Sequence, residues 1–344
     1  MGMTISSKKD TSIETLRGLA IILVVMGHVI GSAADGGMKV ADDSFLRHLY
    51  YSFQYLRMPL FTVISGWVYA LWPAQNGQII DFNIKKIRRL LFPLFLVGGI
   101  YYTMQSVIPG TNFSYELKDI WRILVFPYTF YWYLQSLFIV FVLISFVDAY
   151  GLINKFSGFL VFFFVTLFFL LIRDMVIPQE FPNYFGFKGA IYLFPFFVIG
   201  IGIKRFKQQL SNKVFVWLCA VILIAGLVVQ QLIWYQVINY NLSSSGGLGL
   251  IIGVTGVVVC LRINFSVKWL VWMGSYAYTI YLFHSFGTSG GRIILHKLGL
   301  TYTPVVFFIS LALGLFLPII LEEIFKRFGI TRLLFLGRSF KQKK

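Results

Sequence analysis

The sequence predicts an all-α fold, a polytopic membrane helix bundle of about ten transmembrane helices. The 344 residues are 58% hydrophobic and only 12% charged, whereas a soluble domain carries about 25% charged residues. A water-soluble fold of this size would lack polar side chains to cover its surface. The 37 Phe, 19 Tyr and 8 Trp residues suit a lipid-facing surface with aromatic side chains at the membrane interfaces.

Ten apolar windows are long enough to cross the hydrocarbon core, which takes about 17 to 25 helical residues. The eighth window is the shortest. The loops between the windows are short, and the sequence has no internal repeat. We therefore expect one membrane domain over residues 1–344, with a cytoplasmic segment at 1–15 and a basic cytoplasmic tail at 325–344. The ten windows lie near residues 16–34, 50–72, 90–108, 130–150, 157–177, 188–204, 214–234, 247–261, 269–287 and 304–324.

The formal charge of +17 comes from cations in short loops, and we attribute it to membrane topology and not to nucleic-acid binding. With the N-terminus in the cytoplasm, twenty Lys and Arg residues lie in inside segments and eight in outside segments. Because flanking cations are retained in the cytoplasm, we expect both termini to be cytoplasmic, with an even number of crossings of the cell inner (plasma) membrane. A cleaved signal peptide is disfavoured, because Asp10, Glu14 and Arg17 interrupt its basic region.

Arg17 and His28 lie inside the first window, and ionisable side chains within a membrane predict a function because they are costly. Eleven residues separate them, so they lie about 20° apart around a helix and about 16 Å apart along it. Glu14 is close enough to pair with Arg17. Arg17 alone is better explained as an anchor at the cytoplasmic interface. His28 lies about three turns into the membrane, where a neutral imidazole is suited to take a proton from a hydroxyl; the structural alternative is a histidine bonded to a neighbouring helix.

The second window contains Arg57, Pro59 and Ser65. Pro59 cannot donate its backbone N–H and tends to kink a helix, so we expect this span to be broken around a cavity that Arg57 lines. The alternatives are an anchor at the outer interface for Arg57 and a packing role for Ser65.

A basic cluster precedes the third window and contains Lys85, Arg88 and Arg89. Such clusters most often fix topology or contact anionic lipid headgroups. The alternative is a clamp for the phosphates of a polyanionic donor in the cytosol.

The other histidines and the cysteines carry weaker signals. His284 falls near the predicted outer end of the ninth window, where an imidazole costs little. His48 and His296 lie in predicted outer loops. Four scattered histidines and the isolated Cys219 and Cys260 predict neither a metal site nor a disulfide framework.

Together these segments resemble the acyltransferase-3 family of integral-membrane O-acyltransferases along essentially the whole chain. The most specific segment is the Arg-x10-His pattern formed by Arg17 and His28. Glu14 departs from the aspartate that the family often has there. The resemblance is to stand-alone members, which have no fused extracytoplasmic esterase-like domain. The supporting segments are RMPLFTVISGW, KKIRRLLFP, YWYLQSLF and GSYAYTIYLFH.

This resemblance implies transfer of an acyl group, most often acetyl, from cytosolic acetyl-CoA or another acyl-CoA to a hydroxyl of a surface or lipid-linked glycan, without a metal ion. On this basis we expect catalytic roles for Arg17, His28 and Arg57. His28 would act as a general base or carry the acyl group, and Arg57 would polarise the thioester carbonyl or hold the acceptor. The expected donor-binding residues are Lys85, Arg88, Arg89 and Trp132, and the expected supporting residues are Glu14, Ser65, Tyr281 and His284.

A transporter or flippase for a lipid-linked glycan is the alternative function, because charged residues and broken helices also mark transport pathways. The lack of two repeated halves in the sequence argues against it. A purely structural membrane subunit would leave Arg17 and His28 without a purpose.

Overall fold

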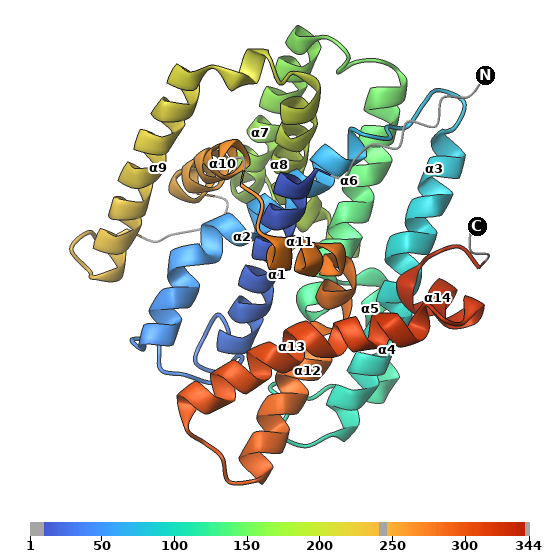
Figure 1. Ribbon diagram of the computed structural model, residues 1–344, viewed down its shortest axis with the longest axis vertical. Helices are drawn as coiled ribbons and strands as arrows, with labels where there is room; N and C mark the ends of the chain where they lie inside the picture. The colour runs from blue at the N-terminus through green and yellow to red at the C-terminus, as the bar shows by residue number, and fades with distance from the viewer. Residues whose placement is uncertain (1–9, 241–245, 264, 341–344) are drawn as a thin grey trace.

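The computed structural model describes residues 10–240, 246–263 and 265–340, and these residues form helices and connecting loops with no strand among them (Figure 1). The all-α fold is therefore confirmed. The first helix begins where the sequence supplies a cap, because the Asp10 side chain accepts hydrogen bonds from the backbone N–H groups of Ser12 and Ile13.

The α-helices have the following bounds. They are α1 (Thr11–Ile30), α2 (Phe45–Tyr69), α3 (Ile79–Lys86), α4 (Phe92–Val107), α5 (Arg122–Val125), α6 (Trp132–Ala149), α7 (Phe156–Val176), α8 (Phe187–Arg205), α9 (Lys213–Trp234), α10 (Gly247–Arg262), α11 (Lys268–Ser275), α12 (Ala277–Lys297), α13 (Thr303–Phe325) and α14 (Gly329–Leu336). A π-helical turn, η1 (Ile87–Leu91), joins α3 to α4, so that residues 79–107 form one continuous helical stretch.

Within the described residues, seven helical stretches are long and apolar enough to cross a membrane, against the ten windows predicted. They contain α1, α4, α6, α7, α8, α9 and α13. Helix α10 is apolar but has only 16 residues. Helices α2 and α12 fall outside this set, and both are rich in polar side chains, including arginine and histidine.

The ninth predicted span, 269–287, differs most from the structure. The chain forms the short helix α11 and starts a new helix, α12, at Ala277. Helix α12 continues to Lys297, ten residues past the predicted end, so Arg292 and His296 lie in a helix and not in an outer loop. The predicted break of the second span is also wrong, because α2 runs unbroken through Pro59.

Helix α1 lies at the centre of the bundle, whereas α7 and α9 lie at its periphery (Figure 1). The share of the apolar window that is buried inside the protein is 72% for α1 and 17% for each of α7 and α9. Neighbours of α1 include α2, α11, α12 and α13. The side chains of α1 therefore face protein, and those of α7 and α9 are free to face lipid.

Both ends of the described chain lie at the same end of the bundle. Gly274 in α11 lies directly against the backbone of Glu14 near the start of α1. Two residues later, the Tyr276 hydroxyl donates a hydrogen bond of 2.9 Å to Glu323 near the end of α13. This arrangement is expected for termini on one side of the membrane, and the identity of that side stays a prediction.

Candidate active site

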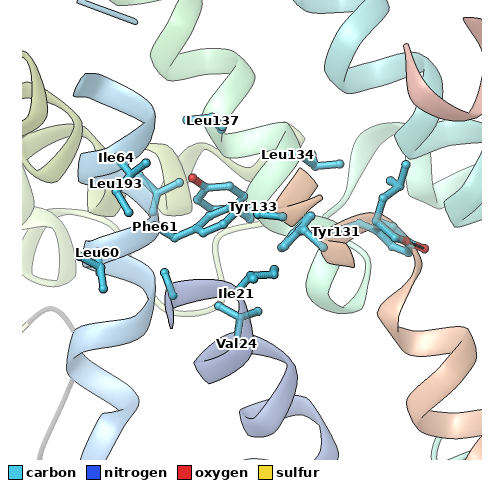
Figure 2. Close-up of a cluster of buried hydrophobic side chains, with 14 of the residues drawn as sticks. Ile21, Val24, Leu60, Phe61, Ile64, Tyr131, Tyr133, Leu134, Leu137 and Leu193 are labelled. Carbon is cyan, nitrogen blue, oxygen red and sulfur yellow. Dashed lines mark hydrogen bonds between the residues drawn. The ribbon is translucent and has the colours of Figure 1, made fainter. Parts of the chain in front are cut away.

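A layer of aromatic side chains crosses the centre of the bundle. Figure 2 shows Phe61 of α2 beside Tyr133 of α6, next to Ile21 and Val24 of α1. The ring centroids of Phe61 and Tyr133 are 5.5 Å apart, and the Tyr281 ring of α12 lies 5.9 Å from Phe61 and 5.4 Å from Tyr133. We call these three residues the aromatic layer. One cavity lies on each side of it. We name them the outer and the inner cavity after the side of the membrane that the predicted topology gives each one.

The outer cavity, of about 390 Å³, is lined by residues of α1, α2 and α12 and by the loops that follow α1 and α4. Two imidazoles line it, those of His28 and His284, and their ring centroids lie 5.0 Å apart. The Phe130 ring packs edge-on against both, at 5.5 Å from His28 and 4.7 Å from His284. Two histidines from different helices thus face one cavity.

His284 is buried at 0% exposure, and not at the outer interface where the sequence placed it. Its Nδ1 lies 2.7 Å from the carbonyl oxygen of Tyr281, and because a carbonyl only accepts, this nitrogen carries the hydrogen. The Nε2 atom therefore holds a lone pair, and it has no hydrogen-bond partner among the described residues. The described part of the site thus includes a buried acceptor without a donor, on a side chain that lines the cavity.

Arg57 also lines the outer cavity, and it lies against α1 immediately before His28. A Cβ atom added at Gly27 would overlap the Nη1 atom of Arg57, so only glycine allows this approach. The Arg57 guanidinium donates a hydrogen bond to the hydroxyl of Tyr50 and packs 4.2 Å from the centre of that ring. The structure therefore brings Arg57 and His28 together at one cavity.

Two buried arginines at the outer cavity were missed in the sequence. Arg292 lines the cavity and donates to Asn112 and to the carbonyl of Gly110. Arg47 donates to the carbonyl oxygens of Gly31 and Val40, which hold the loop after α1. The sequence did contain a signal for Arg292, because it follows His284 by eight residues. On a helix this spacing is two full turns plus about 80° of rotation.

The inner cavity, of about 220 Å³, lies on the other side of the aromatic layer. Arg17, Ser65, Lys86 and Arg89 contribute its polar lining together with hydroxyls of the aromatic layer. Arg17 pairs with Glu14 at 3.4 Å, as the spacing predicted. Arg17 and His28 thus line cavities on opposite sides of the layer, and α1 connects the two.

A basic cavity of about 570 Å³ adjoins the inner cavity, and the two share Trp72, Lys86 and Arg89. None of the described residues that line either cavity is Asp or Glu. Five cations among the described residues line the basic cavity, and they are Lys85, Lys86, Arg88, Arg89 and Arg338.

Local structure orients the cations of this cluster. Arg88 and Arg89 lie in the π-helical turn η1, a form of helix that often occurs at functional sites. The Arg89 guanidinium lies 3.9 Å over the ring of Tyr278, and the Lys86 ammonium lies 3.8 Å from the ring centre of Phe141. The buried Nε of Arg88 has no hydrogen-bond partner among the described residues. Lys86 belongs to the predicted basic cluster but was not among the expected donor-binding residues, although its spacing of three residues from Arg89 places both on one helix face.

The remaining predicted residues divide between the two sides. Ser65 lines the inner cavity, and its hydroxyl lies 3.3 Å from that of Tyr133. The Tyr281 hydroxyl donates to the carbonyl of Phe130, which connects the aromatic layer to the wall of the outer cavity. Trp132 lines the outer cavity, so the structure does not bring it together with Lys85, Arg88 and Arg89. In the described part of the chain, no group of three His, Cys, Asp or Glu side chains is placed to hold a metal ion.

Comparison with known proteins decides the family. A family model described as an acyltransferase domain matches residues 10–323. The chain belongs to the acyltransferase-3 family. This confirms the resemblance seen in the sequence, and the enzyme is an acyltransferase that transfers groups other than aminoacyl groups.

The acyltransferase is also similar to Nodulation protein NolL of Mesorhizobium japonicum (strain LMG 29417 / CECT 9101 / MAFF 303099). The two are 24% identical over 153 residues, which is 42% of this chain and 38% of the relative. The acyltransferase therefore matches well under half the length of that protein. No solved structure matches it.

Proposed function

We propose that this acyltransferase transfers an acetyl group from cytosolic acetyl-CoA to a hydroxyl of a surface or lipid-linked glycan at the plasma membrane. The observation that carries the proposal is the pair of cavities on the two sides of the aromatic layer. Basic side chains line the cavity system on one side, and two imidazoles face the cavity on the other. A donor and an acceptor can thus approach the same layer from opposite faces of the membrane.

The donor side suits a polyanionic thioester. Lys85, Arg88 and Arg89 present their cations to the basic cavity, where they would bind the phosphates of the coenzyme. The thioester arm would then enter the inner cavity past Arg17 and reach the aromatic layer. No carboxylate is among the described lining residues, so none would face the phosphates directly.

The acceptor side supplies proton transfer. His28 removes the proton from the acceptor hydroxyl, the oxygen bonds to the thioester carbon, and the carbon–sulfur bond breaks as the thiolate leaves with that proton. In the stepwise route, a nitrogen of the His28 ring bonds to the thioester carbon as the thiolate leaves. The hydroxyl oxygen then bonds to that carbon, the carbon–nitrogen bond breaks, and the hydroxyl proton goes to the thiolate. Arg57, beside Gly27, stabilises the negative charge that develops on the carbonyl oxygen.

His284 adds a fixed acceptor to this arrangement. Its Nε2 holds a lone pair, and the side chain lines the cavity close to the His28 ring. The reacting hydroxyl donates its one hydrogen to His28, so a second hydroxyl of the sugar would donate to His284 and orient the sugar at the thioester.

The test is release of coenzyme A from acetyl-CoA by the purified protein in detergent, with His28→Ala as the variant. We expect the variant to lose at least about 100-fold in rate, the usual contribution of a general base, while its amount in the membrane stays normal. His48→Ala is the matched control, because His48 bonds to Gln231 outside both cavities and its loss should leave the rate within about twofold. Full activity of His28→Ala would refute the mechanism, and a wild-type protein that never cleaves the thioester would favour the flippase.

A further inference from the structure

The segment after α13 folds back onto the basic cluster. Helix α14 begins at Gly329, and its Leu336 side chain is fully buried. The Phe335 ring stacks on Phe325 with centroids 4.4 Å apart. Arg332 donates to the carbonyl oxygens of Ser339 and Phe340, which turns the backbone back after the helix. Residues 329–340, here called the C-terminal segment, are therefore a packed part of the fold.

The C-terminal segment is joined directly to the expected donor-binding residues. Arg89 donates a hydrogen bond to the carbonyl of Leu336. Gly337, with a φ of +59°, lies against the backbone of Arg88 and Arg89, and a Cβ atom there would overlap the Arg88 carbonyl. The basic cavity thus has one wall from α3 and η1 and another from the C-terminal segment.

Arg338 is the cation on this second wall. It lines the basic cavity, and its Nη2 donates to the buried carboxylate of Glu322, which also accepts from Thr279. Its side chain is 38% exposed, and among the described residues its Nε and Nη1 have no hydrogen-bond partner. One nitrogen anchors the guanidinium, and the other two are left for a ligand.

We propose that Arg338 binds a phosphate of the acyl-CoA donor and that the C-terminal segment is a wall of the donor site. The inference rests on the proposed function, since the donor carries the phosphates. A guanidinium held on one edge presents its other N–H groups in a fixed geometry, which suits phosphate oxygens. Arg88 lines the same cavity, and its buried Nε has no partner among the described residues. Five cations of the described chain around one space favour an anion of several charges over a single carboxylate.

The experiment compares two donors with the full-length variant Arg338→Gln. One donor is acetyl-CoA, and the other is the S-acetyl thioester of N-acetylcysteamine, which has no phosphate. Loss of one charge-assisted hydrogen bond should raise the KM for acetyl-CoA about tenfold and change kcat by less than about twofold. The kinetics with the short thioester should stay unchanged. Arg327→Gln is the matched control, since it removes the same charge from an exposed position on the same side of the protein that does not line the basic cavity.

Each other outcome overturns the inference. Equal losses with both donors would mean that Arg338 only supports the fold, and equal effects of Arg338→Gln and Arg327→Gln would mean a general surface charge effect. If Arg338→Gln does not reach the membrane, Arg338→Lys provides the same comparison, because it keeps the charge and loses only the planar arrangement of donors. The KM of this variant for acetyl-CoA should rise, and an unchanged KM would refute the inference. Failure of the wild-type protein to cleave either thioester would instead refute the proposed function.

Discussion

His28 and His284 differ in how strongly their surroundings fix them. The carbonyl of Tyr281 fixes the hydrogen of His284 on Nδ1. No hydrogen bond holds the His28 ring among the described residues, and its closest polar ring is His284 itself. An imidazole that must take a proton and give it back needs this freedom, whereas one that orients a hydroxyl needs to be fixed. The two histidines therefore suit two different tasks.

Gly27→Ala tests the contact that positions Arg57. The new Cβ would overlap the guanidinium, and because that is the far end of a flexible side chain, Arg57 would swing away from His28 with little loss of stability. We expect the rate to fall about 100-fold, close to the effect of losing one donor to a developing oxyanion. The measurement is kcat with acetyl-CoA, together with the thermal midpoint of the purified protein.

Two further variants test whether Gly27→Ala acts through Arg57. Gly290→Ala changes a glycine of α12 that has open space around it, so it should leave the rate unchanged. The double variant Gly27→Ala/Arg57→Ala should be no slower than Arg57→Ala alone, because both changes remove one interaction. Additive losses would show that Gly27 acts through another group.

At the scale of helices, the boundaries predicted from the sequence are most accurate for helices with uniform surroundings. The boundaries of α7 and α9 lie within one residue of the predicted windows, because both face lipid along most of their length. Helices α2 and α12 extend beyond their predicted windows at residues 45–49 and 288–297, where Arg47 and Arg292 lower the hydropathy. Hydropathy reports which residues suit contact with lipid, and it therefore predicts the boundaries of a helix poorly where that helix faces a polar interior.

The candidate site could be predicted only in the part that lies on a single helix. His28 and Arg17 share one helix, so their spacing alone placed them on one face. Their separation by the aromatic layer depends on Phe61, Tyr133 and Tyr281, which come from three other helices. The pairing of His284 with His28 joins residues 256 positions apart in the sequence. Contacts between distant segments follow from packing, which no local pattern encodes.

Phe61→Trp tests whether the donor arm crosses the aromatic layer. The larger ring would narrow the space between α2 and α6, so kcat should fall about tenfold, while the KM for acetyl-CoA stays within about twofold because the basic cavity is unchanged. Overpacking also costs about 1–3 kcal/mol of stability, which a thermal melt measures. Phe164→Trp is the control, because Phe164 on α7 is 59% exposed. A raised KM with an unchanged kcat would contradict a crossing at this layer.

At the scale of the whole molecule, the two faces of the bundle differ in chemistry. One face gathers the loop after α2, the π-helical turn and the C-terminal segment around five cations. The other gathers the loops after α1 and α4 around the imidazoles, and Arg292, Asn112 and Gly37 connect those loops. The family assignment gives the reaction type. Under the proposed function, the separation of the two faces lets donor and acceptor approach from opposite sides of the membrane.

Labelling of single cysteines in intact cells tests this orientation. Cys219 and Cys260 are free, so alanine at both gives a background without reactive thiols. Ser32→Cys places a thiol on the exposed rim of the outer cavity, and Gln75→Cys places one on the exposed rim of the basic cavity. The excess of cations on the side of the basic cavity predicts that this side is cytoplasmic. A membrane-impermeant maleimide should therefore label Ser32→Cys in intact cells and Gln75→Cys only after permeabilisation. The reverse pattern would place the basic cavity outside the cell, where it could not receive a cytosolic coenzyme.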